Sequence, residues 1–292
     1  MIVRPRPGLL TLFFVLKGSI ILRTWPQLAA VGLLSVIVVA GHRLAPDLVP
    51  GTDPAPFTLI GIALSIFLSF RNNACYDRWW EARKLWGLII ESARDIARQT
   101  VVLDDGPEKL SPERREIFEA VIAFCHAAVG QLRQGSGGQA AGRPADTILH
   151  DAAAATGRLL RQGRLAPVEA LALNDSLGRL TRALVGCERL ANTPLPFAYT
   201  LLLHRTAYLF CFLLPFGFAD MLGWFTPLAA MLVAYTFFGL DALGEELEEP
   251  FGLMPNDLPI SAYAIAVEIH LRAAMGETDL PQMPVPQDYV LT

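Results

Sequence analysis

Long apolar stretches interrupt this chain at four places, and each is a candidate to cross a membrane. They cover residues 26–44, 56–70, 206–222 and 226–240. A membrane-spanning helix needs about 20 apolar residues. The second and fourth stretches are shorter than that, so we expect both to continue as helices into more polar sequence.

Between the second and third stretches, apolar residues recur at spacings of three and four, which is typical of amphipathic helices. The pattern predicts helices near residues 74–103, 111–134, 145–163 and 167–192. Ser111, Pro112 and Glu113 read as an N-cap, a proline at the first helical position and an acidic first turn. No alternating strand pattern is found, and the glycine-rich residues 135–144 predict a flexible connection. The predicted fold class is therefore all-α.

The composition supports an integral membrane protein with a substantial polar part. Hydrophobic residues make up 53% of the chain and charged residues 18%, against about 25% charged residues in a typical soluble domain. The net charge of −4 gives no global positive field for nucleic acid. The sequence therefore disfavours a purely soluble enzyme and a nucleic-acid binder, and membrane lipid is an expected partner.

The distribution of Lys and Arg sets the expected orientation, because cytoplasmic loops are enriched in these residues. Basic residues precede the first stretch and return densely after Phe70, whereas residues 219–225 contain none. We expect four transmembrane helices in the inner (plasma) membrane, with both termini and the central segment in the cytoplasm. The expected divisions are 1–70, 71–204, 205–244 and 245–292, of which the second is a helical cytoplasmic body.

Residues that carry catalytic or metal chemistry are not arranged in a recognisable motif. The five histidines are scattered without metal-ligand spacing, and Cys125 and His126 are merely adjacent in sequence. We expect the four isolated cysteines to be buried apolar residues. The acidic run from Asp241 to Glu249 is interpreted as a solvated helix end, with a divalent-cation site as the alternative. Neither an enzyme nor a cofactor is expected.

The second apolar stretch has a pattern suited to lining a pore. Ile62, Ile66 and Phe70 recur at every fourth position, so they form one stripe on a helix. A parallel stripe of small residues, which would allow close helix packing, consists of Gly61, Ser65 and Ser69. In a ring of identical subunits the bulky stripe would form three apolar collars, and such constrictions gate ions by dewetting. The alternative is a helix face buried against other helices.

Nearly the whole chain, from Arg4 to about Arg272, resembles the bacterial members of the bestrophin family. The resemblance rests on APFTLIGIALSIFLSFRNNACYDRWWEAR (55–83), GCERLANTPLPFAYTLLLHRT (186–206), EELEEPFG (245–252) and NDLPI (256–260). It implies a homopentameric ion channel around a central pore, whose neck is lined at Ile62, Ile66 and Phe70. It also implies a second apolar aperture in the cytoplasmic body, which we place at Leu177, with Leu173 and Leu180 as alternatives.

The resemblance also bears on ion selectivity and calcium. Eukaryotic relatives are calcium-activated anion channels with an acidic run after the PFG segment, whereas this chain has a single Asp257 there. One carboxylate seldom holds calcium, so no metal site is predicted. Bacterial relatives pass monovalent cations, and we expect this chain to conduct small monovalent ions, cations included. The alternatives are an anion (chloride) channel of the same architecture and a membrane-anchored interaction protein without conduction.

Overall fold

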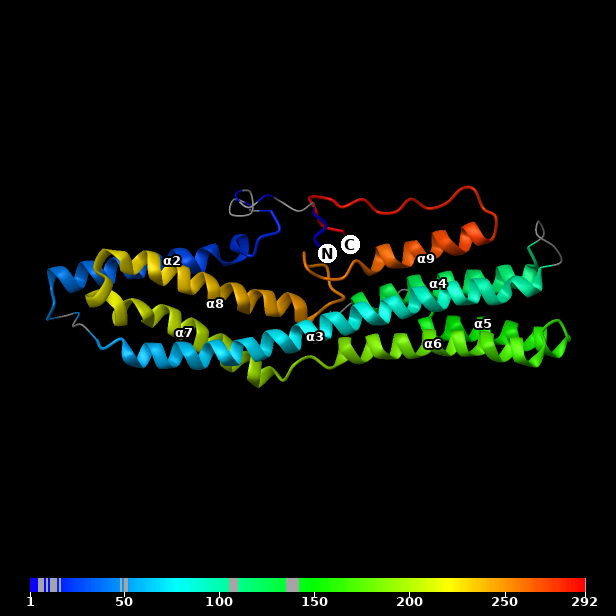
Figure 1. The fold of residues 1–292 in the computed structure, drawn as a ribbon, viewed down its shortest axis with the longest axis horizontal. Coiled ribbons are helices and arrows are strands. Elements are labelled where there is room, and N and C mark those ends of the chain that lie inside the picture. Colours follow the sequence, from blue (N-terminus) through cyan, green and yellow to red (C-terminus); the bar gives the residue numbers. More distant parts are fainter. Residues whose placement is uncertain are drawn as a thin grey trace. The chain divides into compact units, whose positions relative to one another are not determined.

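The computed structural model describes residues 1–4, 8, 10, 15, 17–47, 49, 52–104, 110–134 and 142–291 (Figure 1). Within these residues the chain is helical apart from turns, loops and isolated β-bridges of Val290 with Ile2 and with Gln287. The all-α prediction is confirmed. Most of the predicted glycine-rich connection, residues 135–141, lies outside the described residues.

Two compact units make up the chain, and each combines segments that are distant in sequence. The apolar unit consists of residues 4–78 and 194–248, and the polar unit of residues 1–3, 79–193 and 249–292. The long helix α3 (Ala55–Gln99) contributes its first half to the apolar unit and its second half to the polar unit. The apolar stretch 56–70 therefore continues as a helix into polar sequence, as predicted.

The apolar unit contains α2 (Ile21–Leu44), α7 (Phe197–Leu222) and α8 (Thr226–Glu248), which pack against one another (Figure 1). The short 3-10 turn η2 (Gly223–Phe225) reverses the chain between α7 and α8. A Cβ atom on Gly217 of α7 would lie 2.5 Å from the ring of Phe57, so any larger residue there would force the Phe57 ring to move where α7 meets the first turn of α3. Leu68, Phe238 and Cys211 are among the buried residues of this core.

Three helical stretches are long and apolar enough to cross a membrane by length and composition. They are Ile21–Leu44, Ala55–Leu103 and Phe197–Glu248. The third stretch contains both α7 and α8, which the sequence predicts as separate crossings. Both helices are longer than the apolar stretches 206–222 and 226–240. Helix α7 begins earlier, at Phe197, and α8 ends later, at Glu248.

The polar unit packs α4 (Pro112–Gln134), α5 (Ala145–Arg161), α6 (Pro167–Asn192) and α9 (Ile260–Ala274) with the second half of α3. The first three confirm the helices predicted from apolar spacing, whereas α9 was not predicted. Trp86 and Phe118 are fully buried in the core. The Ser111 hydroxyl accepts the Arg114 N–H at 3.2 Å, as expected of an N-cap. All four cysteines are buried, which confirms their predicted role.

Candidate functional site

The predicted pore stripe lies on the outer face of the first half of α3. Ile62, Ile66 and Phe70 are 56%, 50% and 61% exposed in the single chain. Leu64 and Leu68, on the opposite face of the same helix, are buried in the core of the apolar unit. The stripe is thus not used to hold the chain's own fold, which leaves it available to meet other copies, lipid or an aqueous path.

The stripe of small residues divides between two environments. Gly61 faces α7, and a Cβ atom there would lie 3.1 Å from the ring of Phe210. Ser65 and Ser69 are exposed and line an open cavity of about 420 Å³ together with Asn72 and residues of α8. The Ser65 hydroxyl donates to the carbonyl oxygen of Gly61 at 2.7 Å. Close packing within the chain therefore involves Gly61, while the two serines remain open to a neighbour.

The aperture residues predicted on α6 lie inside the polar unit. Leu173, Leu177 and Leu180 are 2%, 3% and 0% exposed and belong to its hydrophobic core. A side chain that lines an opening between copies has to reach the surface of its own chain. Leu177 is therefore buried within its own chain, and its place at an aperture stays a prediction.

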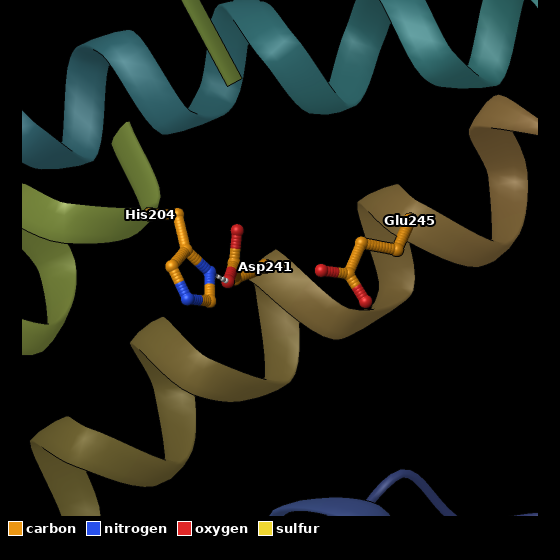
Figure 2. A group of neighbouring side chains, drawn as sticks. All are labelled: His204, Asp241 and Glu245. Carbon is orange, nitrogen blue, oxygen red and sulfur yellow. Dashed lines mark hydrogen bonds and ion pairs between the residues drawn. The ribbon is translucent and has the colours of Figure 1, made fainter. Parts of the chain in front are cut away.

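A network of buried charges connects α3, α7 and α8 within the apolar unit. Arg71 of α3 is fully buried, and its Nη1 lies 2.5 Å from Oδ1 of Asp241. The other oxygen of Asp241 lies 2.7 Å from Nδ1 of His204 (Figure 2). Nη2 of Arg71 also faces the Glu248 carboxylate at 3.8 Å. The buried arginine is thus held by carboxylates of α8, one of which also orients His204.

The interpretation of residues 241–249 as a solvated helix end is wrong for part of the run. Asp241 and Glu246 are 3% and 5% exposed. Burying a carboxylate is costly unless it is paired, and the partners here are cations from other helices: Arg71 for Asp241 and Arg23 for Glu246. Sequence reasoning missed this network because its members are far apart in the chain. The only local signal is the spacing of Asp241 and Glu245, which places both carboxylates on one face of α8.

Glu245 extends this network toward the surface. It forms an ion pair with Arg23 of α2, which also faces Glu246 at 3.6 Å. Figure 2 shows Glu245 directed toward the same space as Asp241 and His204. One potential ligand atom from each of these three residues lies within 4.8 Å of the others. This group is the one place among the described residues where such ligands come together.

The two remaining candidate sites from the sequence, the Cys125–His126 pair and Asp257, have structural roles. Burial raises the pKa of the Cys125 thiol to about 12, and the neighbouring His126 points to Glu268, with Nε2 2.7 Å from the carboxylate. These two residues therefore do not form a nucleophile and base. Asp257 is buried, and its carboxylate accepts the Met254 N–H at 2.7 Å, which ties it to its own loop.

Comparisons with known proteins find one family of similar proteins over nearly the whole length of the chain. The sequence profile of the family described as "Bacterial/Fungal Bestrophin protein" matches residues 1–273. A relative from Mesorhizobium japonicum, the voltage-dependent anion channel-forming protein mll4386, is 43% identical, with 99% of this chain and 97% of the relative covered. The voltage-dependent anion channel-forming protein YneE of Escherichia coli is 38% identical over the whole of both chains.

A solved structure is similar in fold as well as in sequence. The bacterial bestrophin homologue from Klebsiella pneumoniae superimposes with a TM-score of 0.79 at 36% identity. The match covers 86% of this chain and 98% of that chain. The likeness thus includes both the apolar helices and the helical polar unit.

Proposed function

The chain belongs to the bacterial and fungal bestrophin family, and on this premise we propose that it conducts anions through a pore formed by five copies. It is an integral membrane protein of a channel-forming family, not an enzyme. The sequence favoured cation permeation, with an anion channel as the alternative. The curated relatives are named as anion channel-forming proteins, which favours the alternative.

The exposure of the stripe on α3 carries the proposal. Ile62, Ile66 and Phe70 would face the common axis of five copies and form the neck of the pore. Each is at least half exposed in the single chain, whereas the opposite face of the helix is buried. Membership of a channel-forming family favours the axis over lipid.

Apolar collars would select ions by hydration and size more than by sign. An apolar side chain replaces none of an ion's hydration shell, so weakly hydrated ions should pass most easily. Larger halides, which hold water less strongly than chloride, should therefore permeate better than chloride. The four carboxylates near the end of α8 do not oppose this, since each of them is paired with Arg23 or Arg71.

The membrane arrangement follows from the same proposal. α2, the first half of α3, α7 and α8 would cross the inner membrane, with both termini and the polar unit in the cytoplasm. Ser65 and Ser69, exposed beside the collars, would contact the neighbouring copy. A cytoplasmic aperture at Leu177 would require the α6 core to open, so we regard the neck as the main constriction.

The deciding experiment is a reversal-potential measurement in planar bilayers across a KCl gradient. The expected result is a reversal potential close to the equilibrium potential of chloride. A value close to that of potassium would contradict anion conduction and restore the cation alternative. Correctly assembled protein that passes no current at any potential would instead favour a membrane-anchored interaction protein.

A further inference from the structure

Three side chains suited to metal coordination meet within the apolar unit, at the surface end of the buried charge network. His204 comes from α7, and Asp241 and Glu245 lie one turn apart on α8 (Figure 2). One potential ligand atom of each lies within 4.8 Å of the others. We propose that His204, Asp241 and Glu245 bind a divalent transition-metal ion of the Zn²⁺ class.

The types of ligand select the class of ion. An imidazole nitrogen with carboxylate oxygens suits zinc and other first-row transition metals. Calcium prefers about six to eight oxygen ligands, which this group does not supply. Three protein ligands would leave a fourth position of a tetrahedral zinc ion for water.

The spacing of the two innermost ligands fits an ion with little movement. Nδ1 of His204 lies 2.7 Å from Oδ2 of Asp241, joined by a hydrogen bond. Zinc lies about 2.0–2.2 Å from nitrogen and oxygen ligands, so an ion between these atoms needs them to part only slightly. The metal would replace the hydrogen bond between these two atoms, and Glu245 would supply the third ligand from one helical turn away.

Arg71 supplies the outer support that metal ligands need. Its Nη1 holds Oδ1 of Asp241, and this leaves Oδ2 directed at His204. Because Arg71 is fully buried, it cannot swing away and release the carboxylate. Such partners of the ligating groups typically change metal affinity by about 10- to 100-fold when they are removed. The site is thus pre-oriented before any ion arrives.

An ion can reach the group, and a side chain of the protein competes with it. The side chains of His204 and Glu245 are 40% and 38% exposed. Arg23 of α2 pairs with Glu245 and is itself 41% exposed, so it can move into solvent. A bound metal would replace this arginine at Glu245, and metal binding would therefore loosen the contact between α2 and α8.

The experiment is a Zn²⁺ titration of the full-length protein in detergent, by competition with a chromophoric chelator. One ion per chain is expected. His204→Ala and Glu245→Gln should each weaken binding at least about tenfold, because each removes a ligand. Arg23→Gln should strengthen binding, because it removes the competing cation. His126→Ala is the matched control, since His126 also faces a carboxylate, Glu268, at 2.7 Å, and it should bind as the parent protein does.

Two results would overturn the site. One is unchanged Zn²⁺ affinity in both His204→Ala and Glu245→Gln; the other is loss of the stoichiometric ion in His126→Ala. His204→Cys, which keeps a metal ligand at this position, should retain binding and shows that loss in the alanine variant is not caused by misfolding. The titration needs no ionic current, so its outcome is independent of the proposed conduction.

Discussion

Arg71 and Asp241 form an ion pair that is almost completely removed from solvent. The two side chains are 0% and 5% exposed, and Nη1 lies 2.5 Å from Oδ1. Nε and Nη2 of Arg71 have no hydrogen-bond partner among the described residues. Asp241 is therefore the nearest carboxylate that compensates the buried guanidinium, since Glu248 faces Nη2 only at 3.8 Å. Removing one member of a buried pair leaves an uncompensated charge, which costs more than the pair itself contributes.

Asp241→Ala should therefore destabilise the protein by about 3–5 kcal/mol. The measurement is the thermal unfolding midpoint of the purified protein in detergent. The control is Arg158→Gln, which breaks the half-exposed pair with Glu116 and should cost about 0–1 kcal/mol. Equal midpoints for the two variants would show that burial of the Arg71 pair does not matter to stability.

The sequence predicted helices well because their signal is local. Spacings of three and four located α4, α5 and α6, and the shortness of the stretch 56–70 predicted that α3 continues past the membrane. The charge network had no such signal, since Arg71 and Asp241 are 170 residues apart. Tertiary packing alone brings them together.

The same spacing rule also shows why the site residues were harder to predict. Ile62, Ile66 and Phe70 form a regular apolar stripe, and so do Leu173, Leu177 and Leu180. The first stripe is exposed and the second is buried. Periodicity establishes that residues share a helix face, but it does not tell whether that face meets the chain's own core, lipid or another copy.

Leu177→Ala should act on stability and not on conductance. Leu177 is 3% exposed in the core of the polar unit, and truncation of such a leucine costs about 2–5 kcal/mol. Leu171→Ala on the same helix is the control, because Leu171 is 68% exposed and should be nearly neutral. Thermal unfolding and single-channel recording of both variants check this. A Leu177→Ala channel that is fully stable yet conducts more would restore the aperture assignment.

Glu268 should make the polar unit sensitive to acid. Burial raises the pKa of Glu268, but hydrogen bonds from Arg272 and His126 outweigh it and hold this pKa below the usual value. A carboxylate with a depressed pKa stabilises the fold above the unfolded-state pKa of about 4.3, and that stability is lost as the pH falls through the folded-state pKa.

Glu268→Gln should therefore be less stable than the parent protein at neutral pH and should lose less stability on acidification below about pH 4. Unfolding midpoints recorded by circular dichroism from neutral pH downward provide the test. Glu119→Gln serves as the control, because Glu119 is 45% exposed and lies 3.9 Å from Arg272. Parallel acid profiles for Glu268→Gln and the parent would exclude this role.

Ile66→Ala should widen the proposed neck. Ile66 is half exposed, so its truncation should change stability by no more than about 0.5 kcal/mol. In an assembled ring the same change removes one apolar collar, which lowers the cost of keeping the pore hydrated, and single-channel conductance in planar bilayers should rise.

Ile60→Ala is the matched control for the neck. Ile60 is the same residue type on the same helix and is 46% exposed, but at about 100° per residue it lies roughly 120° around the helix from Ile66. If Ile66 faces the axis, the Ile60 variant should conduct as the parent channel does. Equal conductance in the two variants and the parent, in protein that assembles correctly, would mean that the stripe faces lipid and that the water path lies elsewhere.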